Sequence, residues 1–218
     1  MTLFRLTVPT EDEVRRFISK QKDSGFSYPQ VGASATTAPL GYNVDHNRIQ
    51  LGREKVTWQR AVEAIRAWKM FSMPWVNLHW PSAPILVGTD VAVSVLHFGF
   101  YSLNACRIVY LVDEEGPMKR FGFAYGTLAE HAESGEERFT IEWDRNNDEV
   151  WYDILAFSRP RQMFAKLGYP LSRLLQKRFA EGSKAAMLRA ARDTQPSIPC
   201  SACIGARWAE TTLRALLG

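Results

Sequence analysis

The chain has 218 residues, of which 46% are hydrophobic and 23% are charged, and its net charge of +4 is mild. This length and composition are ordinary for a soluble globular protein with one sizeable core. Its three cysteines, an odd number, argue against a disulfide framework, and no signal peptide or membrane-spanning apolar run is visible, so we expect a cytoplasmic protein without integral membrane insertion.

Basic residues concentrate late in the chain, between Arg159 and Arg192. Such a cluster is compatible with an anionic membrane or with nucleic acid, but it is more often the solvated face of a helix. No nucleic-acid-binding motif, phosphate-binding loop or dinucleotide fingerprint accompanies it. We therefore expect no nucleic-acid partner, whereas both a monomer and a homodimer are compatible with the sequence.

The first part of the chain predicts a short edge strand at residues 1–6 and then a helix. Thr10 and Glu13 have the spacing of a capping box, in which each residue satisfies an amide of the other at the start of a helix. Gly25 is expected to end this helix.

Turn-rich segments follow at residues 28–32 and 39–42, where glycine and proline are frequent. The polar stretch 43–50 is predicted to be a surface loop or a strand. Asp45 and His46 within it could serve as an acid–base pair. Adjacent residues on a strand point to opposite faces, however, so we do not expect the two side chains to meet.

A second helix is predicted over residues 56–71, because apolar residues, two tryptophans among them, recur there at steps of three and four. Prolines break the chain between residues 74 and 84. Trp75 and Trp80, close to these prolines, either line the mouth of a cavity or cover the core.

From Ile85 onward the apolar residues alternate, which is typical of strands. Strands are predicted at residues 85–95, 104–112, 121–128, 138–143 and 149–157. A long helix is predicted to begin at Pro170, where the missing amide hydrogen does no harm, and to continue to about Arg192. We therefore expect an α+β fold, in which an antiparallel curved sheet carries a long C-terminal helix packed across it.

Residues 1–192 are predicted to form this single domain, and residues 193–218 to form a C-terminal extension with a short helix. Cys200 and Cys203 make one CxxC pair in the extension. Zinc normally needs four ligands, and no second pair or nearby histidine is present. We predict neither a metal site nor a cofactor.

The candidate site lies between residues 121 and 139, where an aromatic, glycine-punctuated strand is followed by a highly charged stretch. We predict that this stretch is a tight polar loop, and that it brings together His131, Glu136, Glu137 and Arg138 as candidate catalytic residues. A histidine can exchange protons near neutral pH, and burial raises the pKa of a carboxyl toward that range. The plain alternative is a solvated hairpin loop with a local Glu–Arg pair.

Five segments of the chain resemble a known family. The motifs are at residues 28–32, 39–42, 122–128, 131–139 and 156–160, and they resemble uncharacterised protein family 0548, a domain of unknown function. The resemblance covers roughly residues 10–190 and implies no activity. It implies a fold similar to the helix-grip fold of START-like and polyketide-cyclase-like proteins.

Two functions remain open from the sequence. The first is the binding of a small hydrophobic molecule, such as a lipid, an isoprenoid or a polyketide-like compound, in a cavity between the sheet and the last helix. Its candidate ligand-binding residues are Tyr42, Trp68, Trp80, Tyr125, Thr127, Tyr152 and Arg159, although the same aromatic residues would also suit an ordinary closed core.

The second function is a metal-independent enzyme of the cyclase, dehydratase or isomerase type. One group of the 131–138 loop would remove a proton next to a carbonyl, while Arg138 or a tyrosine stabilises the enolate. A metal held by His131, Glu133 and Glu136 is a weaker alternative, because a hairpin rarely presents three ligands to one ion.

Overall fold

The computed structural model describes residues 4–160 and 169–192 of the chain. Within them one antiparallel sheet has the strand order β2-β8-β7-β6-β5-β4-β3, and the short strand β1 pairs with β5. The strands are β1 (Phe4–Arg5), β2 (Asn43–Arg53), β3 (Val76–His79), β4 (Asp90–His97), β5 (Phe100–Glu114), β6 (Met118–Thr127), β7 (Glu133–Asp144) and β8 (Glu149–Pro160). The helices are α1 (Glu11–Gln21), α2 (Glu54–Arg66) and α4 (Tyr169–Arg192), with short 3-10 helices η1 (Ala33–Ala35) and η2 (Lys69–Phe71).

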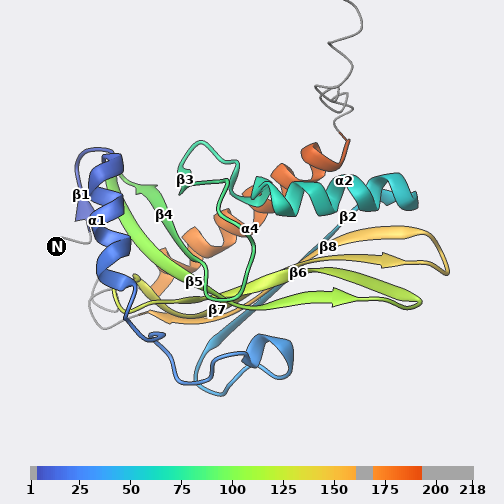
Figure 1. Ribbon diagram of the computed structural model, residues 1–218, viewed down its shortest axis with the longest axis horizontal. Coiled ribbons are helices and arrows are strands. Elements are labelled where there is room, and N and C mark those ends of the chain that lie inside the picture. Colours follow the sequence, from blue (N-terminus) through green and yellow to red (C-terminus); the bar gives the residue numbers. More distant parts are fainter. Residues whose placement is uncertain (1–3, 161–168, 193–218) are drawn as a thin grey trace, which may run out of the picture.

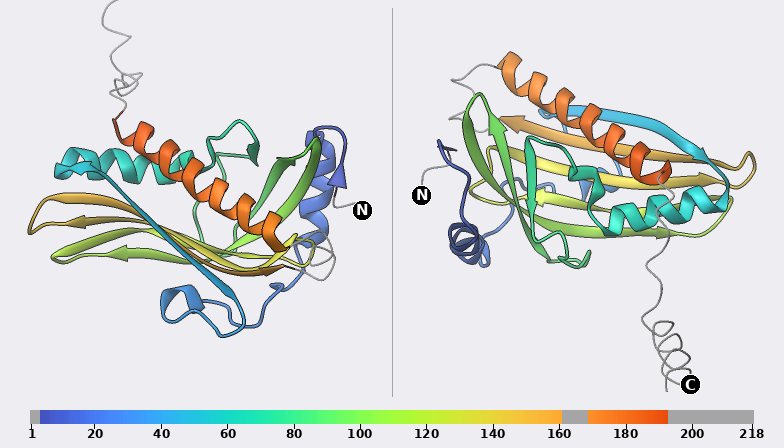
Figure 2. Two further views of the ribbon diagram at one scale, coloured as in Figure 1. Left: turned by 180° about the vertical axis from the view of Figure 1, so that it is seen from behind. Right: turned by 90° about the horizontal axis from the view of Figure 1, so that it is seen from above.

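Helices α2 and α4 lie on one face of the curved sheet, and the segment around η1 lies on the other face (Figure 1). Seen from above, α4 runs obliquely across the strands beside α2 (Figure 2). The predicted α+β fold, with a long C-terminal helix packed across an antiparallel curved sheet, is confirmed. Helix α4 runs from Tyr169 to Arg192, so it begins one residue before the predicted Pro170 and ends where predicted.

Two glycines allow neighbouring strands to approach more closely than other residues would. A Cβ atom at Gly122 would lie 2.0 Å from the backbone oxygen of Phe139, and one at Gly135 would lie 1.9 Å from that of Phe157. Bulges also interrupt the pairing of β5 with β6 and of β2 with β8. Glycines and bulges of this kind are the usual means by which a sheet bends.

The apolar face of α2 packs into the core as predicted, with Trp58, Ala61 and Ile65 buried. The predicted extent of this helix, to residue 71, is wrong. Trp68 adopts a left-handed φ of 54°, which ends the helix, and the chain continues as η2. Trp68 itself remains buried against the sheet.

The beginning of the chain follows the prediction closely. The Thr10 side chain accepts from the Glu13 amide while the Glu13 side chain accepts from the Thr10 amide, so the capping box is present. Helix α1 ends at Gln21, before Gly25. Strand β1 lies within the predicted edge strand.

The polar stretch from Asn43 forms the strand β2, which pairs with β8. Its alternation separates Asp45 from His46, as expected. Asp45 accepts two hydrogen bonds from Arg173 of α4, whereas His46 Nε2 lies 2.5 Å from an oxygen of Asp153 on the opposite face.

The strand predicted from Ile85 begins only at Asp90. The preceding residues instead make turn hydrogen bonds, among them one from the Gly88 amide to the Ile108 oxygen at 2.9 Å. The next strand, β5, is longer than predicted at both ends. The predicted extension at residues 193–218, with Cys200 and Cys203, lies outside the described residues.

Candidate ligand-binding site

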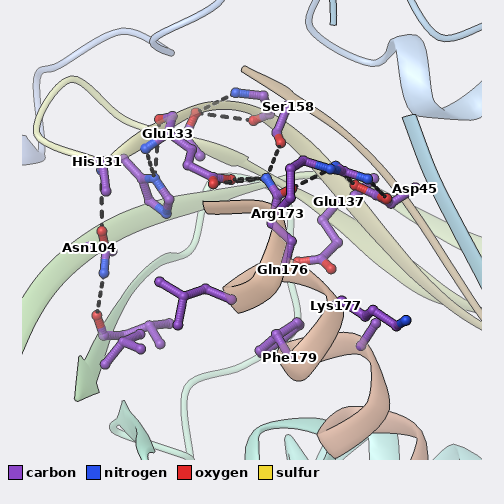
Figure 3. Close-up of a pocket in the computed structure, with 18 of the residues that line it drawn as sticks. Asp45, Asn104, His131, Glu133, Glu137, Ser158, Arg173, Gln176, Lys177 and Phe179 are labelled. Carbon is purple, nitrogen blue, oxygen red and sulfur yellow. Dashed lines mark hydrogen bonds and ion pairs between the residues drawn. The ribbon is translucent and has the colours of Figure 1, made fainter. Parts of the chain in front are cut away.

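A cavity of about 1110 Å³ lies between the curved sheet and helix α4 (Figure 3). Its apolar wall comes from η2, from the strands and from α4, and includes Phe71, Trp75, Val93, Val95, Ile154 and Phe179. A protein interior normally contains few voids larger than a water molecule, so a space of this size differs from a closed core. Other aromatic side chains, such as Trp68 and Tyr152, do fill the closed part of the core.

Glu137 is a carboxyl residue that lines the cavity beside the apolar residues Phe71 and Ile154. Its side chain extends from β7 toward α4 (Figure 3), and its Oε2 accepts a hydrogen bond of 2.9 Å from the Tyr125 hydroxyl on β6. Burial raises the pKa of Glu137 to about 8, and the nearby negative charges of Glu133 and Asp45 add to the rise, while the Tyr125 hydrogen bond opposes it. The carboxyl is therefore mostly protonated at neutral pH.

A polar network closes one side of the cavity, where the first turns of α4 meet β2, β7 and β8. Arg173 donates to both oxygens of Asp45, at 2.5 and 2.6 Å, and to Gln176 Oε1 at 2.7 Å. Gln176 Nε2 in turn lies 2.8 Å from a Glu133 oxygen and 2.7 Å from Ser158 Oγ (Figure 3). Burial raises the pKa of Glu133, although its hydrogen bonds oppose the rise. This network fixes the N-terminal end of α4 on the sheet.

A second group of polar side chains lines the cavity near β4 and β5. Asn104 Oδ1 accepts from the Ala132 amide at 3.3 Å, and its Nδ2 donates to Ser102 Oγ at 3.0 Å. His131 Nδ1 accepts from the Glu133 amide at 2.9 Å. Burial lowers the pKa of His97, and the positive charge of Arg178 contributes to the lowering.

The charged stretch before Arg138 was predicted to form a tight loop, and this prediction is wrong. Strand β7 begins at Glu133, so Glu136, Glu137 and Arg138 belong to a strand and alternate between its two faces. Of the four candidate catalytic residues, His131, Glu136 and Glu137 line the cavity, but the Glu136 carboxylate is bound by Tyr28, Gly32 and Ser34 on the other face of the sheet. Because this carboxylate lies on the other face, it cannot share a metal ion with His131 and Glu133.

Glu136 binds the segment that crosses the outer face of the sheet. Its carboxylate accepts from the Tyr28 hydroxyl at 2.6 Å, from the Gly32 amide at 2.7 Å and from both the amide and the hydroxyl of Ser34. Arg138 lies on the same face, where it donates to the Ser34 carbonyl oxygen at 3.0 Å and pairs with Asp153. These two side chains support the fold rather than the cavity.

Of the seven candidate ligand-binding residues, Tyr125 and Thr127 line the cavity. Thr127 Oγ1 accepts from the Gly135 amide at 2.9 Å and lies 2.6 Å from Ser27 Oγ, so it also holds the end of β6 in place.

The other five candidate ligand-binding residues lie elsewhere. Tyr42 and Arg159 stack on each other at 4.7 Å, beside Phe157. Trp68 donates to the Ala83 oxygen, Trp80 lies under Arg15, and Tyr152 lies 2.9 Å from Ser183 of α4 within the core.

Sequence reasoning missed Asn104 and Gln176 as cavity residues, and it considered Asp45 only as an acid–base partner of His46 and Glu133 only as a metal ligand. The sequence did contain a signal that Glu133 faces the cavity. Glu133 is at an odd-numbered position, as are the apolar residues Phe139 and Ile141 of the same strand. Extending that alternation back along the chain would have placed Glu133 and Glu137 on the inner face. No comparable local signal marks Asn104 or Gln176.

The curved sheet and the helix packed across it, with a cavity between them, define a helix-grip fold. The family model described as "Domain of unknown function (DUF1990)" matches residues 27–186, and the chain belongs to this family. The predicted resemblance to protein family 0548 is thereby confirmed.

Curated relatives match most of the chain. A UPF0548 protein of Dictyostelium discoideum is 34% identical over 212 residues, which cover 88% of this chain and 98% of the relative. A UPF0548 protein of Deinococcus radiodurans is 34% identical over 200 residues, which cover 87% and 99%. Among solved structures, human STARD10 is similar with a TM-score of 0.42 and 11% identity, over 96% of this chain and 86% of that one. Among the described residues, no helix is both long and apolar enough to cross a membrane.

Proposed function

We propose that this protein binds a small, largely apolar molecule, such as a lipid, an isoprenoid or a polyketide-like compound, between the sheet and α4. The observation that carries the proposal is the cavity of about 1110 Å³, whose wall presents mainly apolar surface, although polar and apolar residues both line it. Ligand sites typically have this composition, in which the apolar wall supplies affinity and the polar groups fix orientation. An apolar space of this size left unfilled would sacrifice packing contacts, so a ligand would also stabilise the fold.

Filling the cavity should abolish binding. Ala156 of β8 lines the cavity, so Ala156→Phe would place a ring in the ligand's space. We expect affinity for N-phenyl-1-naphthylamine, an uncharged fluorescent probe, to fall at least tenfold, in line with the loss of about 1.4 kcal/mol or more of contact energy. Fluorescence titration measures this affinity, and native mass spectrometry with organic extraction of the purified protein identifies what it carries.

Leu155→Phe is the matched control, because Leu155 is the neighbouring residue of the same strand and therefore points to the opposite face. It should bind the probe as the wild type does. Equal binding by the wild type and Ala156→Phe would contradict the proposed site, and an absence of bound molecules in both purified and probe-treated wild type would contradict the function.

The second candidate function is proton transfer in the same cavity, favoured by one observation: the buried Glu137 carboxyl with its raised pKa beside Tyr125. A carboxyl that titrates near pH 8 is well suited to remove a proton next to a carbonyl, because a general base works best with a pKa near the operating pH. This candidate retains Glu137 from the predicted catalytic set and replaces Arg138 by Tyr125.

The exchange of decan-2-one hydrogens in D₂O tests this second candidate. The Glu137 carboxylate would take a proton from the carbon next to the carbonyl, leaving an enolate, and the enolate would then take up deuterium. Mass spectrometry should show exchange that the wild type accelerates and that Glu137→Gln slows about 100-fold or more. If the wild type binds the ketone but exchange proceeds at the uncatalysed rate, the second candidate is contradicted and ligand binding alone remains.

A further inference from the structure

Glu137 presents an oxygen to the cavity that the protein itself does not use. Tyr125 donates to Oε2, and no residue in the described ranges 4–160 and 169–192 donates to Oε1. Figure 3 shows the side chain directed from the sheet toward the part of α4 that carries Phe179. Polar groups away from bulk water normally have hydrogen-bonding partners, so this oxygen is a natural contact for a polar group of the ligand.

Among the charged and titratable groups around Glu137, acidic groups outnumber basic ones. They comprise Asp45 of β2, Cys106 of β5, Tyr125 of β6, Glu133 of β7, Tyr152 of β8, and Arg173, Lys177 and Glu181 of α4, and His131, just before β7, lines the same cavity. Arg173 donates to both carboxylate oxygens of Asp45, so the charges of these two residues offset each other. Lys177 is exposed, and the partner of Glu133 is the uncharged amide of Gln176. Within residues 4–160 and 169–192, the cavity therefore holds two carboxyls, Glu133 and Glu137, that form no ion pair with a lysine or an arginine.

We infer that the ligand of this cavity is an amphiphilic amine, whose apolar body fills the space under α4 and whose ammonium group binds Oε1 of Glu137. This inference rests on the proposed ligand-binding function. An ammonium would satisfy the unused oxygen with a charge-assisted hydrogen bond and would supply the missing positive charge. A carboxylate ligand would instead favour the protonated form of Glu137 and would meet a second carboxyl at Glu133, so it would gain no ion pair from either residue.

Binding of the amine should release a proton. In the free protein near pH 7 Glu137 is mostly protonated, because burial raises its pKa to about 8. The ammonium pairs with the carboxylate, so the carboxyl gives up its proton to solvent while the amine keeps its own. Affinity should accordingly rise by up to about tenfold per pH unit between pH 6 and 8 and then level off.

The experiment compares decylamine, decan-1-ol and decanoate, which share a chain and differ in the head group. Each displaces N-phenyl-1-naphthylamine from wild-type protein at pH 6, 7 and 8. We expect decylamine at pH 8 to bind at least tenfold more tightly than decan-1-ol and decanoate to bind most weakly. Only decylamine should gain affinity as the pH rises from 6 to 8.

Glu137→Gln should remove both the amine preference and its pH dependence, while decan-1-ol binds as before. The amide is close in shape to the protonated carboxyl and keeps an acceptor for Tyr125, so the cavity should persist. Glu63→Gln is the matched control, because Glu63 is exposed on α2 and pairs with Arg66 at the surface. It removes the same charge and should leave all three affinities unchanged.

The outcomes separate the inference from the function on which it rests. Tight decan-1-ol binding without an amine preference, a preference for decanoate, or an amine preference that survives Glu137→Gln would overturn the inference and leave the binding function standing. Failure of the wild type to bind the probe or any of the three compounds would overturn both, whereas failure of all three to displace a bound probe would overturn the inference alone. If Glu137→Gln does not fold, the wild-type pH series alone decides, since flat decylamine affinity from pH 6 to 8 contradicts a role for Glu137.

Discussion

Replacement of Gly135 by alanine should lower the free energy of unfolding by about 3 kcal/mol or more. The added Cβ would lie 1.9 Å from the Phe157 oxygen and 2.8 Å from the Ser158 Cα. Both are backbone atoms of β8, so no side chain can rotate away, and relief requires β7 and β8 to separate. Overpacking of side chains alone typically costs about 1–3 kcal/mol, and a conflict between two paired backbones should lie at or above that range.

Urea unfolding followed by tryptophan fluorescence measures the change, with Gly25→Ala as the control. A Cβ at Gly25 meets nothing within 4 Å, so this variant should unfold close to the wild-type midpoint. Wild-type stability for Gly135→Ala would mean that the two strands are farther apart than described. The close approach of β7 to β8 would then not explain the bend of the sheet beside the cavity.

The architecture could be predicted because its signals are local. Alternating apolar residues identify the strands, the three- and four-residue spacing identifies α2, and Thr10 with Glu13 marks the start of α1. Helix ends were less predictable. Trp68 ends α2 by adopting a left-handed conformation, and nothing in the apolar spacing distinguishes it from the helical residues before it.

The site was less predictable because charge suggested a loop where the backbone continues as a strand. Glutamates are disfavoured in strands in general, yet Glu136 and Glu137 are each held by partners from elsewhere in the chain. Tyr28, Gly32 and Ser34 surround Glu136, about a hundred residues away in sequence, and Tyr125 binds Glu137. Such long-range hydrogen bonds override local propensity. The charged residues could therefore be identified from the sequence, but the face of the sheet on which each of them lies could not.

Glu136→Gln should destabilise the protein by about 3 kcal/mol, although it changes only one group in a long side chain. One oxygen of Glu136 accepts from Tyr28 and Gly32, and the other accepts from the amide and hydroxyl of Ser34. An amide has only one oxygen, so in either orientation its NH₂ group faces donors that then lose their acceptor. Hydrogen bonds to a charged group contribute about 1.5–3 kcal/mol each, and buried donors left without partners add a further cost.

The neighbouring change, Glu137→Gln, provides the sharpest comparison, because the two variants have the same chemistry at adjacent positions of β7. Urea unfolding at pH 7 should show a large loss for Glu136→Gln and little loss for Glu137→Gln, whose carboxyl is already mostly uncharged. Probe displacement should show the reverse, with the amine preference kept in Glu136→Gln and lost in Glu137→Gln. Equal losses of stability would contradict the assignment of these two glutamates to opposite faces of the sheet. In that assignment Glu136 stabilises the fold on the outer face, whereas Glu137 binds the ligand on the inner face.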